Sequence, residues 1–358
     1  MITGIERLNA AIKGEVLDRI PVFCNLLDQG AKELGLSLEE YYSKGEYVAE
    51  GQIRMRERYG YDNVWSLFYV GKEAELLGCQ KILFAQDGPP NVQDFVIKSY
   101  DDIPKLQIPD NIADHPAFQE ELTCLRLLKA EVGGKYSIAA YITSSMTLPV
   151  LLMGMEKWLE LLLWGPPDLR DELLSKCHAF FTREMTAYRH AGANVLVYSN
   201  PFGSIDTIPL KFFREHALPW IEKDINAVGV EGLVYYCGTS RMNAVIDIVL
   251  ERTGVTTYNL SPFDDIAEGK RIIAGRALTV GVLNDLKLID WSSDEIRQEV
   301  KRILEAGMPG GKFAFGTMGM PYCISEENIR TMLEAAYQFG SVKPQECESS
   351  AFAVKAEL

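Results

Sequence analysis

The sequence predicts a single α/β domain of the (β/α)8-barrel, or TIM-barrel, class. Eight short segments rich in β-branched and aromatic residues alternate with longer segments that have helical periodicity. The chain is 358 residues long, a length at which such barrels form one domain. No GxGxxG segment follows an early strand, and this disfavours the alternative architecture, an open doubly wound sheet.

The expected elements follow one another in the order that a barrel requires. The strands are expected at 20–25, 63–68, 137–143, 195–199, 233–236, 256–259, 278–283 and 312–315. The helices are expected at 116–132, 167–191, 210–228, 241–252, 264–273, 294–306 and 326–339. Gly192, Gly254 and Gly307 stand at the ends of three of these helices, where glycine commonly forms a C-terminal cap.

Two segments lie outside the alternation. A helical extension is expected before the first strand, and residues 73–97 alternate in period two around an Asp-Gly-Pro-Pro turn at 87–90. This pattern predicts a hairpin inserted after the second strand, overhanging the face where the strands end. Because no linker composition interrupts the chain, we expect one barrel domain, 1–340, and a short C-terminal tail, 341–358.

The composition excludes several classes of function. A formal net charge of -14 argues against nucleic acid, because phosphate binding needs clustered lysine and arginine. The seven cysteines have no CxxC spacing, which is typical of reduced thiols in the cytosol. The first residues carry charges where a signal peptide needs an apolar run, and no apolar stretch is long enough to span a bilayer. We therefore expect a cytoplasmic protein with no nucleic-acid or membrane partner.

Several short motifs resemble those of one protein family, both in their residues and in their order along the chain. They are RLNAAIKGE followed by DRIPV (7–22), EAELLGC (73–79), AGANVL (191–196), YYCGTS (235–240) and EENIRTMLEAA (326–336). Together they make the chain similar to the uroporphyrinogen decarboxylase superfamily over residues 5–339. This resemblance implies a (β/α)8 barrel and therefore agrees with the strand pattern.

The superfamily contains two chemistries, and the sequence departs from the first. Its decarboxylases bind a porphyrinogen with eight carboxylates, using arginines in an RQAGRY loop after the first strand. Here the loop at 24–30 is CNLLDQG, which has no arginine and contains Asp28. The decarboxylase's C-terminal histidine segment is also absent, since 315–323 is FGTMGMPYC. Porphyrinogen decarboxylation is therefore the disfavoured alternative.

The second chemistry is corrinoid-dependent methyl transfer, and EAELLGC, FAQDGPP (84–90) and SYDDIPKL (99–106) are more similar to that branch. Its thiol-alkylating members bind zinc through an HxCG motif and a later cysteine. Here Cys237 and Gly238 remain, but Tyr235 stands in the place of the histidine. The later cysteine aligns with Gly319, while Cys323 lies four residues further on. The resemblance thus leaves Cys237 and Cys323 as candidate metal ligands and leaves the presence of zinc open.

The end of the fifth strand supplies the candidate catalytic residues. Tyr235 and Tyr236 are neighbours on a strand, so one points into the barrel and the other points toward the helices. By parity with Cys237, we expect Tyr235 to point inward, where its phenol would donate a proton to a departing oxygen. The alternative for Tyr235 is core packing with a satisfied hydroxyl, and for Cys237 it is a small buried hydrophobe.

Four asparagines at strand ends are expected to form a neutral, hydrogen-bonding rim for a small ligand. They are Asn25, Asn200, Asn259 and Asn284. Aromatic residues near the same ends, including Trp65 and Tyr141, would form an apolar wall suited to an aryl or methyl-bearing substrate, with core packing as the alternative.

Four carboxylates near the same strand ends are weaker candidates for a catalytic role. Asp28 and Asp285 are candidate general bases that we expect to be solvated. We expect Glu73 and Glu75 to lie on an exposed hairpin edge.

These observations predict a corrinoid-dependent methyltransferase. It would move a methyl group between a small methylated substrate, such as an aryl methyl ether in O-demethylation, and a corrinoid-binding protein that carries the cobalamin-type cofactor. A homodimer is left open. The alternatives are a divergent uroporphyrinogen decarboxylase and a non-catalytic barrel that binds a corrinoid partner.

Overall fold

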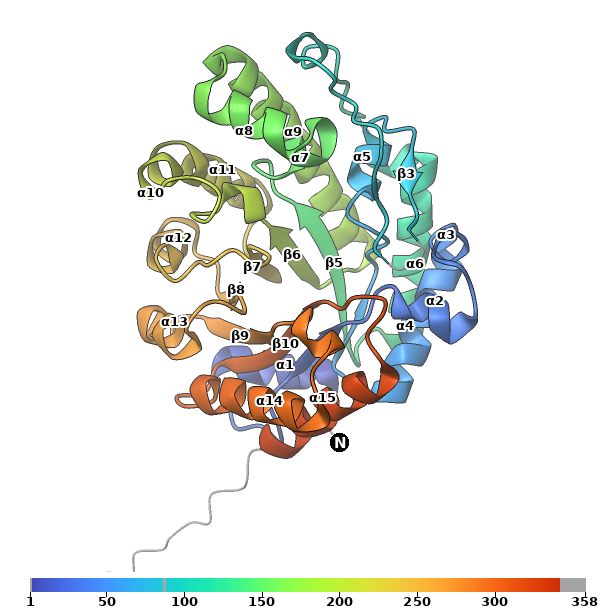
Figure 1. The fold of residues 1–358 in the computed structure, drawn as a ribbon, viewed down its shortest axis with the longest axis vertical. Coiled ribbons are helices and arrows are strands. Elements are labelled where there is room, and N and C mark those ends of the chain that lie inside the picture. The colour runs from blue at the N-terminus through green and yellow to red at the C-terminus, as the bar shows by residue number, and fades with distance from the viewer. Residues whose placement is uncertain (1, 86–87, 342–358) are drawn as a thin grey trace, which may run out of the picture.

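A ring of eight parallel strands forms the centre of the molecule, and helices encircle it (Figure 1). The computed structural model describes residues 2–85 and 88–341. The strands are β1 (Val22–Asn25), β2 (Asn63–Trp65), β5 (Ser137–Thr143), β6 (Val195–Ser199), β7 (Leu233–Tyr236), β8 (Thr257–Asn259), β9 (Leu278–Leu283) and β10 (Phe313–Gly319). They are ordered β1-β10-β9-β8-β7-β6-β5-β2, and every neighbouring pair is parallel. The predicted (β/α)8 barrel and its eight strands are confirmed.

Side chains close the seam between the first and last strands of this order, β1 and β2. The Cys24 backbone N–H donates to Asn63 Oδ1 at 2.9 Å, and Asn63 Nδ2 donates back to the Cys24 carbonyl at 3.2 Å. Beside them, the Asp62 N–H donates to the Val22 carbonyl at 2.9 Å. The Asn63 amide and one backbone hydrogen bond therefore link β1 to β2 in place of a full ladder, and the barrel is nearly closed.

The outer layer contains one main helix after each barrel strand. These helices are α4 (Gly45–Tyr59), α6 (Pro116–Val132), α9 (Pro167–Ala191), α11 (Leu218–Val228), α12 (Ile246–Thr253), α13 (Ile266–Ile273), α14 (Ser293–Gly307) and α15 (Glu326–Phe339). Additional helices lie in the connections: α2 (Gln29–Leu34), α3 (Leu38–Tyr41), α5 (Lys72–Leu76), α7 (Leu148–Met153), α8 (Met155–Trp164) and α10 (Leu210–Phe212).

Two expected helices differ from the sequence pattern for identifiable reasons. The segment expected at 210–228 is divided by a π-helical turn, Phe213–Ala217, just before Pro219, which has no N–H to donate. The helix expected from residue 241 begins only at Ile246. The Asp264 carboxylate accepts hydrogen bonds from the N–H groups of Met242 and Asn243, and it holds them outside the helix.

The three helix-terminal glycines do not all serve as caps. Gly192 and Gly254 have φ values of 116° and 72° and cap α9 and α12, as expected. Gly307 is instead the last residue of α14, whose cap is Met308, so the expectation of a glycine cap is wrong there. A Cβ at Gly307 would lie 2.1 Å from the Phe313 ring, so close packing explains the glycine.

Alternate strand residues separate into an inner and an outer core. Inward residues such as Val195 and Leu278 pack on Leu8 and Ala11 of helix α1 (Gly4–Lys13), which covers the N-terminal end of the barrel. The outward residues pack against the surrounding helices in the main core. The predicted N-terminal helical extension is confirmed, and it forms the floor of the barrel.

The predicted insertion is confirmed in part. β3 (Ile82–Leu83) pairs antiparallel with β4 (Asn91–Val92), so a hairpin follows β2. It is shorter than expected because α5 takes up the start of the segment, and residues 86–87 at the turn lie outside the described residues. Gly71, shortly after β2, lies against Ile82 and Val92, which places the hairpin at the C-terminal ends of the strands.

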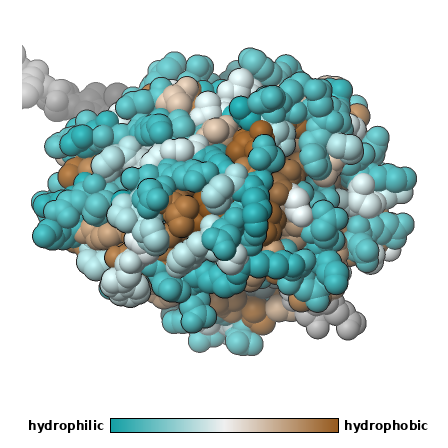
Figure 2. Space-filling view, turned by 90° about the horizontal axis from the view of Figure 1, so that it is seen from above, coloured by the Kyte–Doolittle hydropathy of each residue, from teal (hydrophilic) through white to brown (hydrophobic). Residues whose placement is uncertain are grey.

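Within the described residues, no helix combines the length and apolar character needed to cross a membrane. The face seen in Figure 2 is largely hydrophilic, with apolar areas set between polar side chains.

Candidate active site

A cavity of about 580 Å³ occupies the interior of the barrel. We call this cavity the lumen. All eight strands contribute to its wall, which extends from Asn25 and Gly319 at the C-terminal strand ends to Leu8 and Ile12 of α1. Catalytic residues of (β/α)8 enzymes lie at the C-terminal ends of the strands. The lumen's C-terminal opening, the mouth, is therefore the candidate active site.

Polar side chains from five strands gather at the mouth: Asn25, Tyr141, Tyr236, Asn259 and Thr317. The strand register places Tyr236 opposite Asn259, and the rings of Tyr141 and Tyr236 meet edge to face. The Tyr141 hydroxyl is hydrogen-bonded to Ser199. Asn259 Oδ1 is buried without a hydrogen-bond partner among the described residues. A ligand hydroxyl or amine at the mouth would satisfy that oxygen.

The inward orientation expected for Tyr235 is wrong. Tyr236, not Tyr235, lines the lumen, while Tyr235 and Cys237 share the outer face and belong to the main core. Tyr235 packs between the rings of Tyr198 and Tyr258, with centroids 5.8 Å away on each side. Its hydroxyl accepts a hydrogen bond from Asn200 Nδ2 at 3.1 Å. Tyr235 and Cys237 share one face of the strand, as the parity predicts, but that face is the outer one.

The four asparagines divide into two pairs. Asn25 and Asn259 line the lumen, and so do Trp65 and Tyr141. Asn200 is fully buried outside it, where its Oδ1 accepts a hydrogen bond from Ser144 Oγ at 2.7 Å. Asn284 Oδ1 accepts from the Lys287 N–H at 3.2 Å and so opens the 3-10 turn Lys287–Ile289. The structure therefore brings four of the expected site residues together and leaves Asn200, Asn284, Tyr235 and Cys237 apart from them.

The sequence pattern did not single out several polar residues of the lumen, among them Ser137, Thr257 and Thr317. Ser137 is the first residue of β5 and has the same parity as Tyr141, which was the available signal. Thr257 has the same parity as Asn259 on β8. Thr317 lay beyond the expected end of the last strand, because β10 continues through Gly316 to Gly319.

The donor set does not fit zinc. Cys237 is 1% exposed and belongs to the main core on the outer face of its strand, so it does not line the lumen. Cys323 is exposed in the loop after β10. No three His, Cys, Asp or Glu side chains in the described part of the chain are grouped as a metal site would require. We therefore derive no catalytic step through zinc.

Two aspartates expected in solvent are buried. Asp285 is 9% exposed, and burial raises the pKa of its carboxyl to about 6. Asp285 does not line the lumen, but it follows the last residue of β9, Leu283, by two residues and so lies at the C-terminal ends of the strands, beside the mouth. Burial is the main cause that raises the pKa of the Tyr236 hydroxyl, and the charges of Tyr141 and Asp285 add to it. Asp28 is also buried, where it accepts a hydrogen bond from the Tyr42 hydroxyl at 2.6 Å, and burial raises its pKa. An acid with a pKa near 6 can give up a proton at neutral pH.

Glu73 belongs to a buried carboxyl cluster rather than to an exposed hairpin edge, so that expectation is wrong. It lies on α5 and accepts a hydrogen bond from the Thr143 N–H at 2.7 Å. Glu121 of α6 and Glu184 of α9 are also buried, and burial raises the pKa of all three carboxyls. Glu75 is partly exposed and pairs with Lys72 at 3.2 Å. None of these residues lines the lumen, so the described cluster lies outside the site.

Charge is nearly absent from the wall of the lumen. Glu231, at the N-terminal end, is the one charged residue among the described residues that line it. A ligand with many carboxylates would find no arginine or lysine there to pair with. The site is therefore suited to an uncharged, mainly apolar ligand with a few hydrogen-bonding groups.

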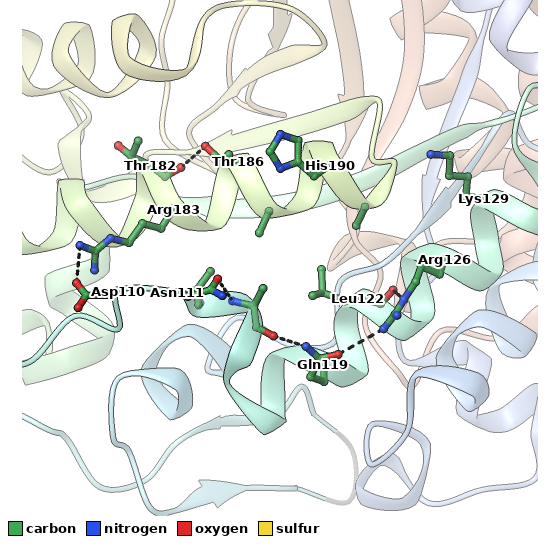
Figure 3. A pocket seen from close by; sticks show the side chains of 14 residues that line it. Asp110, Asn111, Gln119, Leu122, Arg126, Lys129, Thr182, Arg183, Thr186 and His190 are labelled. Atoms are coloured by element: carbon green, nitrogen blue, oxygen red, sulfur yellow. Dashed lines mark hydrogen bonds and ion pairs between the residues drawn. The ribbon is translucent and has the colours of Figure 1, made fainter.

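A second pocket, of about 680 Å³, lies on the outside of the molecule between α6 and α9 (Figure 3). Arg126, Lys129, Arg183 and His190 give it a basic character. Its residues come from helices and their connections, not from strand ends, so it is separate from the mouth.

The family follows from comparison with known proteins. The family model for uroporphyrinogen decarboxylase (URO-D) matches residues 3–339. The chain belongs to the uroporphyrinogen decarboxylase family. Relatives of this URO-D family member include both of the family's activities. The methylcobamide:CoM methyltransferase MtbA of Methanosarcina mazei is 23% identical over 346 residues, covering 94% of this chain and 98% of the relative. A uroporphyrinogen decarboxylase of Trichlorobacter lovleyi is 23% identical over 348 residues, covering 93% and 98%.

A solved structure confirms the fold of this URO-D family member. A methyltransferase from Methanosarcina mazei superposes with a TM-score of 0.82 at 21% identity, covering 95% of this chain and 99% of that one. The relatives are enzymes of two kinds, so the residues of the site must decide between them.

Proposed function

We propose that this URO-D family protein is a corrinoid-dependent methyltransferase that moves a methyl group between a small methylated substrate and a corrinoid protein. The observation that carries the proposal is the lumen with a polar mouth and no lysine or arginine among its described lining residues. Such a site suits a small neutral substrate and offers no cation to a porphyrinogen's carboxylates. The similarity to methylcobamide:CoM methyltransferases supports the same class.

The donor direction, from substrate to corrinoid, fits the side chains better than thiol methylation. Thiol methylation needs a thiolate, and no three metal-binding side chains of the described residues are grouped to activate one. In the donor direction the methyl–oxygen bond of an aryl methyl ether breaks, and its electron pair stays on the oxygen, which takes up a proton. The reduced corrinoid of the partner supplies the electron pair that forms the new bond to the methyl carbon. The products are a phenol and the methylated corrinoid protein.

The residues at the mouth divide this task. Tyr236 takes over the role expected for Tyr235 and donates a hydrogen bond to the departing oxygen. Because burial raises the pKa of the Tyr236 hydroxyl above its ordinary value of 10, it holds its proton and acts as a hydrogen-bond donor. Asp285, with a pKa of about 6, supplies the proton that the phenolate oxygen needs. Asn25 and Asn259 orient the substrate.

The corrinoid protein must approach the mouth, since the methyl group is transferred there. Phe263 and Leu286 follow β8 and β9 and are 59% and 64% exposed, which is unusual for large apolar side chains. We propose that these two residues contact the partner around its corrinoid.

The test combines the purified protein, a reduced corrinoid protein and a neutral methoxyarene. The proposal predicts that the visible spectrum of the corrinoid changes on methylation while an equal amount of phenol forms. Conversion of uroporphyrinogen to coproporphyrinogen, without corrinoid methylation, would instead establish a decarboxylase. Binding of the corrinoid protein without either reaction would establish a non-catalytic scaffold.

A further inference from the structure

The barrel of this protein is hollow where such barrels are usually filled. Layers of bulky side chains normally pack the interior of a (β/α)8 barrel. Here Val197 and Val280, in the middle of their strands, are 8% and 7% exposed because they face the lumen. Two other inward positions, Ala139 and Gly316, have small or no side chains. The cavity therefore continues below the mouth to α1.

The depth of the lumen can be measured along β5. Ser137 stands at its lower end, where the Lys135 carbonyl accepts a hydrogen bond from Ile5 of α1. Tyr141 stands at the mouth, four residues further along the same strand. A strand rises about 3.3 Å per residue and is tilted by about 36° from the barrel axis, so the lumen is about 11 Å deep between these two residues. This depth fits a para-substituted aromatic ring with a side chain of about three carbons.

Each end of the lumen presents a buried polar atom that has no hydrogen-bond partner among the described residues. Asn259 Oδ1 lies at the mouth, and Ser137 Oγ lies near the floor. Ser137 is fully buried, and leaving a buried hydroxyl unsatisfied is unfavourable. A ligand with one polar group at each end and an apolar body between them would satisfy both atoms.

We propose that the lumen binds an elongated, uncharged phenol and its methyl ether lengthwise, with the phenolic oxygen at Asn259 and Tyr236 and a second hydroxyl at Ser137. Ser137 is then a specificity-determining residue, because it recognises the far end of the substrate. This inference rests on the proposed function, since it assumes that the methyl donor occupies the barrel. Beyond the proposed function, the inference specifies that the methyl donor is elongated, is uncharged and carries a second polar group at its far end.

Direct binding of the demethylated phenols tests the inference without the corrinoid protein. The probes are 4-(3-hydroxypropyl)phenol, 4-propylphenol, which lacks the far hydroxyl, and 3-(4-hydroxyphenyl)propanoate, which has a carboxylate there. Calorimetry should show that the hydroxypropyl compound binds about 3- to 10-fold more tightly than the propyl compound, as expected for one hydrogen bond. The carboxylate should bind most weakly, because its charge would be buried without a cation.

Variants locate the binding mode. Ser137→Ala should remove the preference for the hydroxypropyl compound. The matched control is Ser66→Ala, because Ser66 is also buried and follows β2 but bonds to the Ala139 carbonyl and does not line the lumen. That variant should keep the preference. Ala139→Leu should fill the middle of the lumen and lower the affinity for the hydroxypropyl compound by at least 10-fold. Unsubstituted phenol should still bind at the mouth of this variant. Thermal unfolding confirms that each variant is folded.

The outcomes separate this inference from the proposed function. Equal binding of all three probes, unchanged by Ser137→Ala and Ala139→Leu, would overturn the lengthwise site even if corrinoid methylation from another donor is observed. The expected binding pattern with no methyl transfer from the matching methyl ether would uphold the lumen site and overturn the methyltransferase.

Discussion

The rings of Tyr141 and Tyr236 meet edge to face inside the barrel, with their centroids 6.3 Å apart and their planes at 72°. Their hydroxyls have different partners. Tyr141 is hydrogen-bonded to Ser199, whereas the partner of Tyr236 among the described residues is the thioether of Met318, at 3.6 Å. A thioether is a weak acceptor, so the Tyr236 phenol is available to a substrate oxygen.

Tyr236→Phe should therefore lower methyl transfer by about 100-fold, as removal of one donor to a developing oxyanion does. The neighbouring Tyr235→Phe is the matched control, because that ring lies on the opposite face of β7. It should leave transfer unchanged and lower the free energy of unfolding by about 1 kcal/mol, through loss of the hydrogen bond from Asn200. Transfer rates and denaturant unfolding measure the two effects. The reverse pattern would return the catalytic role to Tyr235.

The pH dependence of demethylation should report Asp285. Burial raises the pKa of this carboxyl to about 6, and the proposed acid acts only when protonated. The demethylation rate should be constant below pH 6 and should fall about 10-fold per pH unit above it, until protonation of the departing oxygen by another donor becomes faster. Asp285→Asn should give a slower rate that lacks this inflection. Initial rates between pH 5 and 8 decide the matter, and an identical profile in the variant would remove Asp285 from the mechanism.

The sequence predicted the barrel well because strand and helix periodicity are local properties. Segments such as 137–143 and 233–236 coincide with observed strands, and parity correctly placed Tyr235 and Cys237 on one face. Which face that was could not be read from the chain, since Val234 and Tyr236 are as compatible with the core as Leu233 and Tyr235. The face depends on how the barrel closes, which is a long-range property.

Burial of charged groups was also beyond the sequence. Glu73 lies in the first turn of the short helix α5 and Asp285 lies in a turn after β9, where carboxylates are usually solvated. Their burial arises from partners distant in the chain, such as Thr143 for Glu73. The expectation that all four asparagines form the rim was wrong for a related reason. Asn200 is hydrogen-bonded to Ser144, which lies 56 residues away in the chain.

Substitutions of Asn63 and Asn259 test whether the Asn63 amide closes the barrel. Asn63→Ala would leave the N–H and the carbonyl of Cys24 without partners at the β1–β2 seam. We expect a loss of about 2–4 kcal/mol in the free energy of unfolding, because two buried backbone groups become unsatisfied. Asn259→Ala removes an amide that faces the lumen, so it should change stability by less than about 1 kcal/mol and weaken phenol binding. Denaturant unfolding and calorimetry measure the pair, and similar stability losses in both would contradict the distinction.

The carboxyl cluster formed by Glu73, Glu121 and Glu184 should make the protein less stable as the pH rises. Burial raises the pKa of Glu121 from an ordinary value of 4.5 to about 7, and it raises that of the other two in the same direction. Between pH 4.5 and about 7, the folded protein holds a proton that the unfolded chain has released. Unfolding therefore releases this proton, and the free energy of unfolding falls as the pH rises through that window, by about 3 kcal/mol for Glu121 alone.

Glu121→Gln mimics the protonated acid and can still accept the hydrogen bond from the Tyr188 hydroxyl. The variant should match the wild type near pH 4.5 and exceed it in stability at pH 7 and above, with a shallower fall between. Glu131→Gln, at an exposed position of the same helix, should keep the wild-type slope. Denaturant unfolding at half-unit steps from pH 4.5 to 8 measures the slopes. If the slope survives Glu121→Gln unchanged, this carboxyl is ionised in the folded protein, and a cation or water must then stabilise its charge.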